Sequence, residues 1–370
     1  MKISSIEAIP VSYPLEEEAF DSTAKWDEFN LLIVKVYTDE GFIGVSDIAP
    51  LHGREMKIFE KIILDKLAPK VVGENPFDRE KIWVKMVGFG SEAYALGRSG
   101  AIITASSAID IALWDIVGKS LNTPVYNLFG GRARDSVELY ASFMGQPPVE
   151  RIKDVLGEGF MGVKVKVGFN VKKDIEYLRG LRSELGYDFK LMVDGNQGYS
   201  LEEAKDFAWR AEELEILWFE EPVNVYNFKG LKVLSKTVRI PLALGENYYM
   251  ISEFLKVIED GTVRIIQPDV NHAGGLTQMR KISLIAEAYD VKLAPHLHSI
   301  VGFVAGLHVL MAQANGFIAE YPVYGKKWTF RDKFIEKCVT IEDGFCQLNC
   351  RSGIGIELDE SYIKDYITED

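Results

Sequence analysis

A chain of 370 residues with 47% hydrophobic and 26% charged residues has the composition of a folded globular protein, which excludes a disordered chain. Its length exceeds what one hydrophobic core usually serves, so we expect two domains or one large barrel with an appendage. The net charge of -13 would repel nucleic acid and anionic membranes, and no apolar run approaches the roughly 18 residues of a membrane span, so we expect neither partner.

Residues 1 to about 130 read as an α+β unit. β-Branched and apolar runs predict strands over Ile3 to Val11, Leu31 to Thr38 and Gly41 to Ile48. Residues 99–119 form a long, mostly apolar helical pattern that we expect to be buried. An acidic run near the N-terminus arrives before any apolar stretch of signal-peptide length, so we expect no targeting segment.

Eight short apolar runs follow from Val137 onward, separated by seven amphipathic stretches with helical spacing. Strands that alternate with helices predict a parallel sheet, and eight strands predict closure into a (β/α)7β TIM-like barrel over residues 131–322. An open, doubly wound sheet is the alternative. The predicted strands are 137–143, 162–167, 190–193, 216–219, 241–244, 263–266, 291–294 and 316–319.

Residues 323–370 contain strand-like and glycine-rich pieces that are too short to form a domain. We expect this tail to pack on the N-terminal unit and complete it. The three cysteines, Cys338, Cys346 and Cys350, lie in the tail and lack the CxxC spacing of a zinc site. Their odd number and crowding fit a reducing compartment, so we expect a cytoplasmic protein.

Chemically functional side chains stand at seven of the eight predicted strand ends. Active sites of βα barrels lie on that face. A single carboxylate after a strand is usually a helix N-cap, but the recurrence favours one shared site. The residues, in strand order, are Lys164 with Lys166, Asp194, Glu220, Glu246, Asp269, His296 and Glu320.

Asp194, Glu220 and Glu246 end three consecutive strands that lie about 4.8 Å apart, so their carboxylates can converge on one point. An all-oxygen set without cysteine or histidine suits a hard cation. This predicts a Mg²⁺ site, with Mn²⁺ as the other candidate ion. The cation would also let an acidic protein hold a small anionic substrate.

Two pairs of side chains suit acid/base chemistry. Lys164 and Lys166 lie on one face of a strand, where we expect each to lower the other's pKa toward neutrality; a solvated edge-strand pair is the alternative. Asp269 and His296 end neighbouring strands, so the carboxylate can favour the charged imidazole; a core histidine is the alternative. Lys166 and His296 would then face each other across a substrate.

Seven segments resemble the enolase superfamily, and within it the mandelate racemase group. The resemblance spans nearly the whole chain and implies an α+β capping domain with a (β/α)7β barrel. The segments are KVK at 164–166, MVDGNQ at 192–197, WFEEP at 218–222, GEN at 245–247, QPD at 267–269, PHLHS at 295–299, and Glu320 within FIAEY.

The resemblance implies roles for the same residues. A protonated Glu320 would donate to the substrate carboxylate, and the protein would be a symmetric homo-oligomer. The muconate cycloisomerase group is similar but has a second lysine where this chain has Asp269, which argues against cycloisomerisation. The implied Mg²⁺ ligands are Asp194, Glu220 and Glu246, and the implied acid/base catalysts are Lys166 and the His296–Asp269 dyad.

Loops of the capping unit should select the substrate. Those near residues 15–30 and 50–56 are polar, and Lys25, Trp26, His52 and Arg54 suit a polyhydroxylated acid better than an aryl group; charged surface loops are the alternative. We also assign Asn196 and His298 to substrate binding. These residues favour dehydration of an aldonate or aldarate to a 2-keto-3-deoxy acid.

Three other functions stay open at this point. A racemase or epimerase of a 2-hydroxy acid such as mandelate uses the same machinery. A metal-dependent amidohydrolase-type barrel would place zinc on His296 and His298. A non-catalytic binding protein would need neither lysine.

Overall fold

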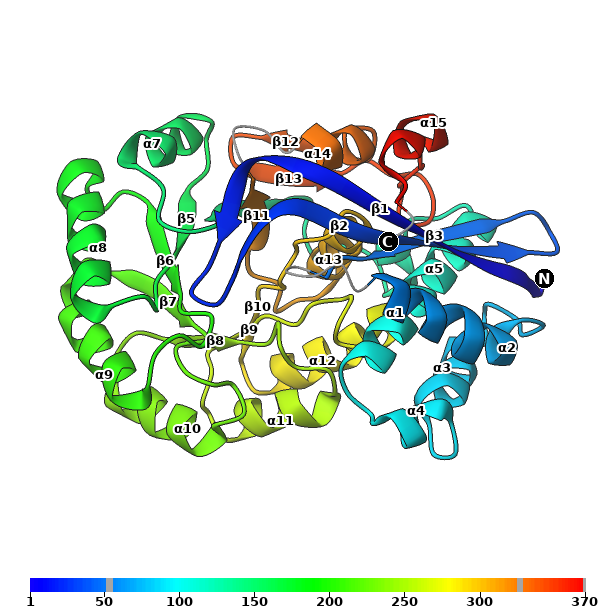
Figure 1. The fold of residues 1–370 in the computed structure, drawn as a ribbon, viewed down its shortest axis with the longest axis horizontal. Helices are drawn as coiled ribbons and strands as arrows, with labels where there is room; N and C mark the ends of the chain where they lie inside the picture. The colour runs from blue at the N-terminus through cyan, green and yellow to red at the C-terminus, as the bar shows by residue number, and fades with distance from the viewer. Residues whose placement is uncertain (51–55, 325–328, 369–370) are drawn as a thin grey trace.

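A computed structural model describes residues 1–50, 56–324 and 329–368 (Figure 1). The N-terminal unit contains the antiparallel sheet β1-β2-β3, formed by β1 (Ile3–Phe20), β2 (Lys25–Thr38) and β3 (Ile43–Ile48). Its helices are α1 (Met56–Lys61), α2 (Ala68–Val71), α3 (Arg79–Val87), α4 (Glu92–Leu96), α5 (Ala101–Ser120) and α6 (Val125–Leu128), with a π-helix over Ile62–Leu67.

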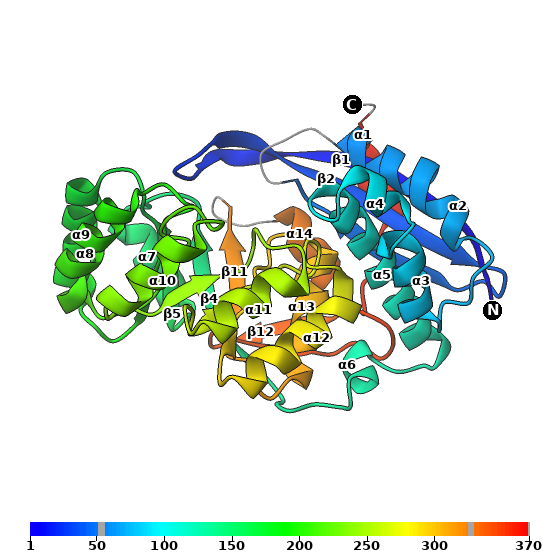
Figure 2. The same ribbon diagram turned by 90° about the horizontal axis from the view of Figure 1, so that it is seen from below.

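The β1–β2 hairpin is longer than the sequence pattern predicted, and it reaches across the barrel (Figures 1 and 2). Strand β1 continues through Pro14 and an acidic run to Phe20 and pairs with β2 down to Lys25. Prolines are tolerated here because β1 is an edge strand, where a missing N–H leaves no neighbour unpaired. The hairpin therefore brings capping residues to the barrel mouth.

Helix α5 is the core of the capping unit. Its length and composition would let it span a membrane, which differs from the expectation that no segment comes close, but 94% of the apolar window is buried inside the structure. It packs against β2 and β3 on one side and against the barrel helix α12 (Gly275–Ala288) on another. It thus acts as the core helix that joins the two units.

Residues 137–323, all of which are described, form the barrel. Strands β4 (Val137–Phe143), β5 (Gly162–Lys166), β6 (Lys190–Asp194), β7 (Ile216–Glu220), β8 (Leu242–Leu244), β9 (Ile265–Ile266) and β10 (Lys292–Leu293) pair in parallel in that order. Strand β11 (Ala319–Val323) pairs with β4, and a parallel bridge from Leu293 to Gly316 joins β10 to the segment before β11. These contacts join the sheet into a ring and confirm the predicted fold class.

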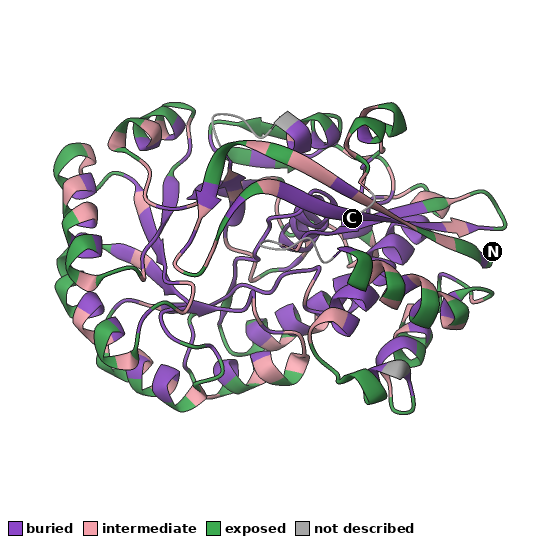
Figure 3. Cartoon of the chain, viewed as in Figure 1, coloured by how far each residue is buried: buried purple, intermediate pink, exposed green. Residues whose placement is uncertain are grey.

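Seven helices connect the eight strands over these residues, as predicted. They are α7 (Val149–Gly157), α8 (Val171–Leu185), α9 (Leu201–Arg210, followed by a 3-10 turn over Glu212–Leu214), α10 (Phe228–Thr237), α11 (Ile251–Glu259), α12 and α13 (Val301–Ala312). Most strand residues are buried, and α7 to α12 have buried inner faces and exposed outer faces, whereas α13 is buried on all sides from Val301 to Met311 (Figure 3). Below the mouth, inward side chains fill the barrel: Tyr140, Met192, Trp218, Ala243, Ile265, Ala294 and Ile318.

Only the last predicted strand is displaced. Residues 316–318 lie beside β10, and the strand proper begins at Ala319, so Glu320 lies within β11 instead of after it. The shift reflects the change of partner from β10 to β4 at this point in the ring.

The tail contacts both units. Helix α14 (Thr329–Ile335) leads to the hairpin β12 (Val339–Glu342) and β13 (Phe345–Leu348), and β13 pairs with barrel strand β4. Helix α15 (Glu360–Ile363) and a 3-10 turn (Lys364–Tyr366) follow, and Ile367 bridges to Val11 of β1. The hairpin thus differs from the expectation that the whole tail packs on the capping unit, because β4 has a free edge below the point where β5 and β11 pair with it.

Candidate active site

A cavity of about 320 Å³ lies at the barrel mouth, between the strand ends and the tip of the β1–β2 hairpin. The hairpin contributes Asp21, Thr23 and Trp26, and the barrel contributes the rest of the lining. The barrel residues are Met144, Lys166, Asn196, Gln197, Glu246, Asn247, His272, His296, His298 and Glu320. The cavity has the size of a small-molecule site.

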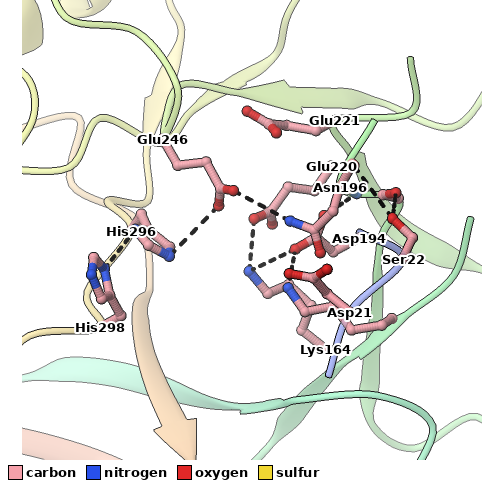
Figure 4. A network of polar contacts seen from close by, with 12 residues as sticks. Asp21, Ser22, Lys164, Asp194, Asn196, Glu220, Glu221, Glu246, His296 and His298 are labelled. Carbon is pink, nitrogen blue, oxygen red and sulfur yellow. Dashed lines mark hydrogen bonds and ion pairs between the residues drawn. The ribbon is translucent and has the colours of Figure 1, made fainter. Parts of the chain in front are cut away.

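The three predicted metal ligands converge in the structure (Figure 4). One oxygen from each of Asp194, Glu220 and Glu246 lies within 4.8 Å of the others. Strand register brings them together, because Asp194 pairs with Glu220 on neighbouring strands and Glu246 follows the next strand. All three are at least nine-tenths buried.

This donor set fits a hard divalent cation. Burial, together with the charges of Asp194 and Glu246 and against the opposing effect of Lys164, raises the pKa of Glu220 to about 8. A cation between the three carboxylates would relieve that repulsion, and oxygen-only donors select Mg²⁺ or a similar ion. Glu220 is also held in place, since its Oε2 accepts hydrogen bonds from Gln267 Nε2 at 2.6 Å and Trp218 Nε1 at 3.0 Å.

Lys164 and Lys166 form ion pairs with the carboxylates of the site. This corrects the expectation for the pKa values of the two lysines. Lys164 Nζ is 2.7 Å from Glu220 Oε1 and 2.9 Å from Glu320 Oε1, and Lys166 Nζ is 2.6 Å from Asp194 Oδ2. Burial works to lower the pKa of both lysines, and Lys164 lowers that of Lys166, but the surrounding carboxylates outweigh these effects and raise both pKa values. The prediction that mutual repulsion lowers them toward neutrality was wrong because it counted only the two ammonium groups.

On the other side of the cavity, Asp269 and His296 form a hydrogen-bonded dyad. His296 Nδ1 lies 2.8 Å from Asp269 Oδ2, which leaves Nε2 directed toward the cavity, 3.6 Å from Glu246 Oε2. Burial disfavours the charged ring, but Glu246, Glu320 and Asp269 together raise the pKa of His296 to about 10. The ring is therefore positively charged at neutral pH, as the sequence analysis expected.

Glu320 differs from the role that the resemblance implied. Burial raises the pKa of its carboxyl, but Lys164 and His296 outweigh that effect and bring the pKa below its usual value. Its Oε2 also accepts a hydrogen bond from the Leu297 backbone N–H at 3.1 Å. An ionised Glu320 that pairs with Lys164 is an acceptor here, not a protonated donor.

The predicted substrate-binding residues separate into three groups. Trp26, Asn196 and His298 line the cavity, although His298 Nε2 is already engaged by the Ala49 carbonyl at 2.9 Å. Lys25 is outside the lining: its side chain is 68% exposed and pairs with Glu18, because neighbouring residues of a strand point to opposite faces. His52 and Arg54 lie outside the described residues.

Several residues in or directly behind the cavity lining were not predicted. Glu221 is fully buried beside Glu246 and accepts two hydrogen bonds from Asn247 Nδ2, at 3.0 and 2.8 Å. His272 lines the cavity and stacks on Tyr249. The second glutamate of WFEEP was the available signal for Glu221, whereas nothing in the local sequence showed that residues 21–26 would reach a barrel strand 170 residues away.

Comparison with known proteins agrees with this geometry. Residues 148–362 match the family described as Enolase C-terminal domain-like, and residues 15–130 match the Mandelate racemase / muconate lactonizing enzyme, N-terminal domain. The chain belongs to the enolase superfamily. The two matches cover most of the capping unit and the barrel, which confirms the predicted family and replaces the amidohydrolase-type alternative.

Individual superfamily members resemble the whole chain. Arabinonate dehydratase of Saccharolobus solfataricus is 29% identical over 91% of this chain and 90% of its own. The crystal structure of 3,6-anhydro-D-galactonate cycloisomerase from Zobellia galactanivorans is 31% identical over the full length of both chains, with a TM-score of 0.88. That of a racemase from Streptomyces coelicolor with bound magnesium is 27% identical over 99% of this chain and 100% of its own, with a TM-score of 0.90.

The cycloisomerase bears on one further expectation. A second lysine in place of Asp269 distinguishes the muconate type, so its absence argues only against that type. A protein named as a cycloisomerase is similar over the full length, so the absence of that lysine does not by itself exclude cycloisomerisation.

Proposed function

We propose that this protein removes the proton α to the carboxylate of a sugar acid and completes a dehydration to the 2-keto-3-deoxy acid. The observation that carries the proposal is the opposition of Lys166 and the His296–Asp269 dyad around one cavity that also contains three converging carboxylates. Two acid/base groups on either side of a carbon, with a cation beside them, suit proton abstraction α to a carboxylate. The similarity to an arabinonate dehydratase supports the sugar-acid substrate.

The chain's own residues divide the work. Lys166 is the base for the α-proton, and the Asp194 charge that raises its pKa would be shared with a bound cation. His296 presents Nε2 to the cavity: as an imidazolium it is suited to give its proton to the leaving 3-hydroxyl, and as the neutral ring it would take the α-proton of the opposite C2 epimer. Mg²⁺ held by Asp194, Glu220 and Glu246, with Mn²⁺ as the substitute ion, would supply charge stabilisation for the enediolate.

Two related reactions are second candidates, each favoured by a similar protein. Return of the proton to the opposite face gives a racemase or epimerase, and a racemase structure is among the similar ones. Departure of a ring oxygen in place of a hydroxyl gives a cycloisomerisation, and a structure named as that of a cycloisomerase is also among the similar ones. All three share the first proton transfer.

Proton NMR in D₂O separates them. The purified protein with Mg²⁺ is incubated with aldonic acids, aldaric acids, their lactones and mandelate, with and without chelator. We expect loss of the α-proton signal and appearance of a 3-deoxy-2-keto acid, both abolished by chelator. Deuteration without a new product would establish racemisation or epimerisation, and no reaction with any acid would contradict the proposal.

The setting of the protein completes the proposal. Three free thiols in the described residues favour a reducing, cytoplasmic compartment. The net charge of -13 disfavours nucleic acid and anionic membranes as partners. We further propose a symmetric homo-oligomer, which light scattering of the purified protein would test.

A further inference from the structure

Asp47, near the end of β3, is a fully buried carboxylate that contacts the barrel instead of its own domain. Its Oδ2 accepts hydrogen bonds from the backbone N–H groups of Ile300 and Val301, both at 2.8 Å. Its Oδ1 accepts from the Gly302 N–H and from Asn271 Nδ2, each at 3.2 Å. Four donors thus converge on one side chain of the capping unit.

Three of these donors form the N-terminus of α13, where the first N–H groups of a helix have no partner within the helix. Ile300, at the N-cap position, has no side chain that could accept them. A carboxylate at this end is favoured by both hydrogen bonding and the helix dipole. Asp47 therefore caps a barrel helix from another domain, and the helix follows directly on the loop that carries His296 and His298.

The fourth donor reaches the other half of the dyad. Asn271 Nδ2 also donates to the Asp47 backbone carbonyl, and the Asn271 N–H donates to Asp269 Oδ1 at 2.7 Å. Asp47 consequently holds the loop of Asp269 and the loop of His296 at once. Since His296 Nδ1 bonds to Asp269 Oδ2, the separation of these two loops sets the geometry of the dyad.

A second contact, made directly after the same capping strand, supports the first. His298 Nε2 is 2.9 Å from the Ala49 carbonyl, two residues after Asp47, and His298 Nδ1 is 3.1 Å from Asp269 Oδ2. The packing is close, because a Cβ on Gly302 would lie 2.1 Å from Asn271 Oδ1 and 2.2 Å from Ser299 Oγ. This junction has little space in which to rearrange.

The loop that follows Lys166 is held differently. Gln146 Nε2 donates to the Lys166 carbonyl at 3.1 Å and to Asp174 Oδ1 at 2.8 Å, and all three residues belong to the barrel. The capping unit touches this side through Ser22, whose hydroxyl donates to the Gly195 carbonyl at 2.9 Å. Within the described residues, the hydrogen bonds of the Asp47 carboxylate all go to the histidine half of the site.

We infer that Asp47 is a positioning residue for the His296–Asp269 dyad: it sets the dyad from the capping unit, so that steps performed by His296 depend on Asp47 and steps performed by Lys166 do not. The expected loss of the steps performed by His296 rests on the proposed function. The expected change in the position of the dyad rests on geometry alone. Misplacement of a catalytic group by about 1 Å can cost on the order of 100-fold in rate.

The test compares Asp47→Asn with Asp115→Asn. Asp115, on α5, is also buried and also accepts backbone N–H groups, from Val45 at 3.0 Å and from Ile354 at 2.8 Å, but these donors belong to neither dyad loop. It therefore controls for the loss of a buried, multiply bonded aspartate. Circular dichroism and thermal unfolding establish that both variants are folded.

The kinetic readout is α-proton exchange in D₂O with Mg²⁺ and two pairs of C2-epimeric acids, D-gluconate with D-mannonate and D-galactonate with D-talonate. Two C2 epimers that bind in the same pose present the α-proton to opposite sides of the cavity. In Asp47→Asn, exchange of the epimer that faces His296 should fall about 100-fold, while exchange of the one that faces Lys166 changes less than about threefold. Asp115→Asn should slow neither epimer selectively. Equal loss for both epimers, or no loss, would overturn the inference.

A second readout needs no substrate and separates this inference from the proposed function. The Nδ1–H proton of His296, bonded to Asp269, should give a downfield NMR signal that is assigned by its disappearance in His296→Asn. We expect the signal to persist in Asp115→Asn and to shift or vanish in Asp47→Asn. An unchanged signal in Asp47→Asn would overturn the positioning role even if no tested acid reacts.

Discussion

The two sides of the cavity are built in different ways. The lysine side, formed by β5, β6 and β7, obtains its geometry from strand register, which places Lys166 beside Asp194 and Asp194 beside Glu220. The histidine side, at the ends of β9 and β10, has strands of only two residues, and its loops are fixed by Asp47 and Ala49 of the capping unit. One side is a property of the barrel, and the other is a property of the assembled protein.

This difference indicates which perturbations should act locally. Changes to the lysine side remove charge at a point that the sheet has already fixed. Changes to the histidine side can act from a distance, because the contacts that set it come from residues about 250 positions earlier in the chain. Substitutions and pH changes can therefore separate the two sides.

Loss of a metal ligand should disable the lysine side completely. Asp194→Asn removes a carboxylate that contacts Lys166 and belongs to the convergent triad, so we expect kcat to fall by about 1,000-fold. We expect a similar fall when wild type is treated with chelator. Product formation by NMR measures it. Asp206→Asn, at an exposed Asp–Arg pair on α9, is the matched control and should retain activity. Full activity of Asp194→Asn without added cation would contradict the metal assignment.

Acidification should weaken the histidine side through α13. His308 on that helix is fully buried, accepts a hydrogen bond from the Tyr126 N–H at 3.2 Å and lies 3.0 Å from the Ile354 carbonyl; burial lowers its pKa to about 4. Below the unfolded value of about 6.5, the unfolded chain binds a proton that the folded chain does not, so stability is lost as pH falls from 6.5 toward 4.

Urea unfolding of wild type and His308→Gln at pH 7.5 and pH 5 measures this effect. The stability advantage of wild type should shrink by about 2 kcal/mol at pH 5, since each pKa unit corresponds to about 1.4 kcal/mol. Asp110, whose pKa burial raises to about 6, titrates in both proteins and cancels from the difference. An advantage that is constant or larger at pH 5 would show that His308 is not held neutral.

The smallest effect concerns the hairpin over the mouth. Trp26 lines the cavity whereas Lys25 faces solvent, so the two neighbours form a matched pair. Trp26→Leu should lower kcat/KM about tenfold through lost contact with the substrate, and Lys25→Ala should change it less than about twofold. Steady-state kinetics on the substrate found by NMR measures kcat/KM for both variants. A larger loss for Lys25→Ala than for Trp26→Leu would contradict the assignment of Trp26 to the cavity and of Lys25 to the solvent.

The lysine side could be predicted from the sequence because parallel strands of regular spacing bring their ends to one level. Lys166, Asp194 and Glu220 follow from that rule alone. The directions of the Lys164 and Lys166 pKa shifts could not be predicted in this way, because they depend on which charged groups surround each ammonium group in the folded protein. Lys164 pairs with Glu320 across the ring closure, a contact that no local pattern shows.

The histidine side could be predicted only in part. The spacing of Asp269 and His296 indicates a dyad, but the roles of Asp47 and Ala49 depend on how the capping unit docks. The hairpin reach was missed for the same reason: Pro14 and the acidic run are poor strand signals, and pairing with β2 overrides them. Long-range docking is thus the part of this site that local sequence does not determine.

The most direct test of the account is the face from which the α-proton leaves. In D₂O with Mg²⁺, Lys166→Met should lose exchange of one C2 epimer and keep that of the other, and His296→Asn should show the opposite pattern, each loss amounting to about 100-fold or more. That complementary result is what two opposed acid/base groups predict. Loss of exchange for both epimers in either variant, or for neither, would contradict the central claim that the two sides of the cavity act on opposite faces of one carbon.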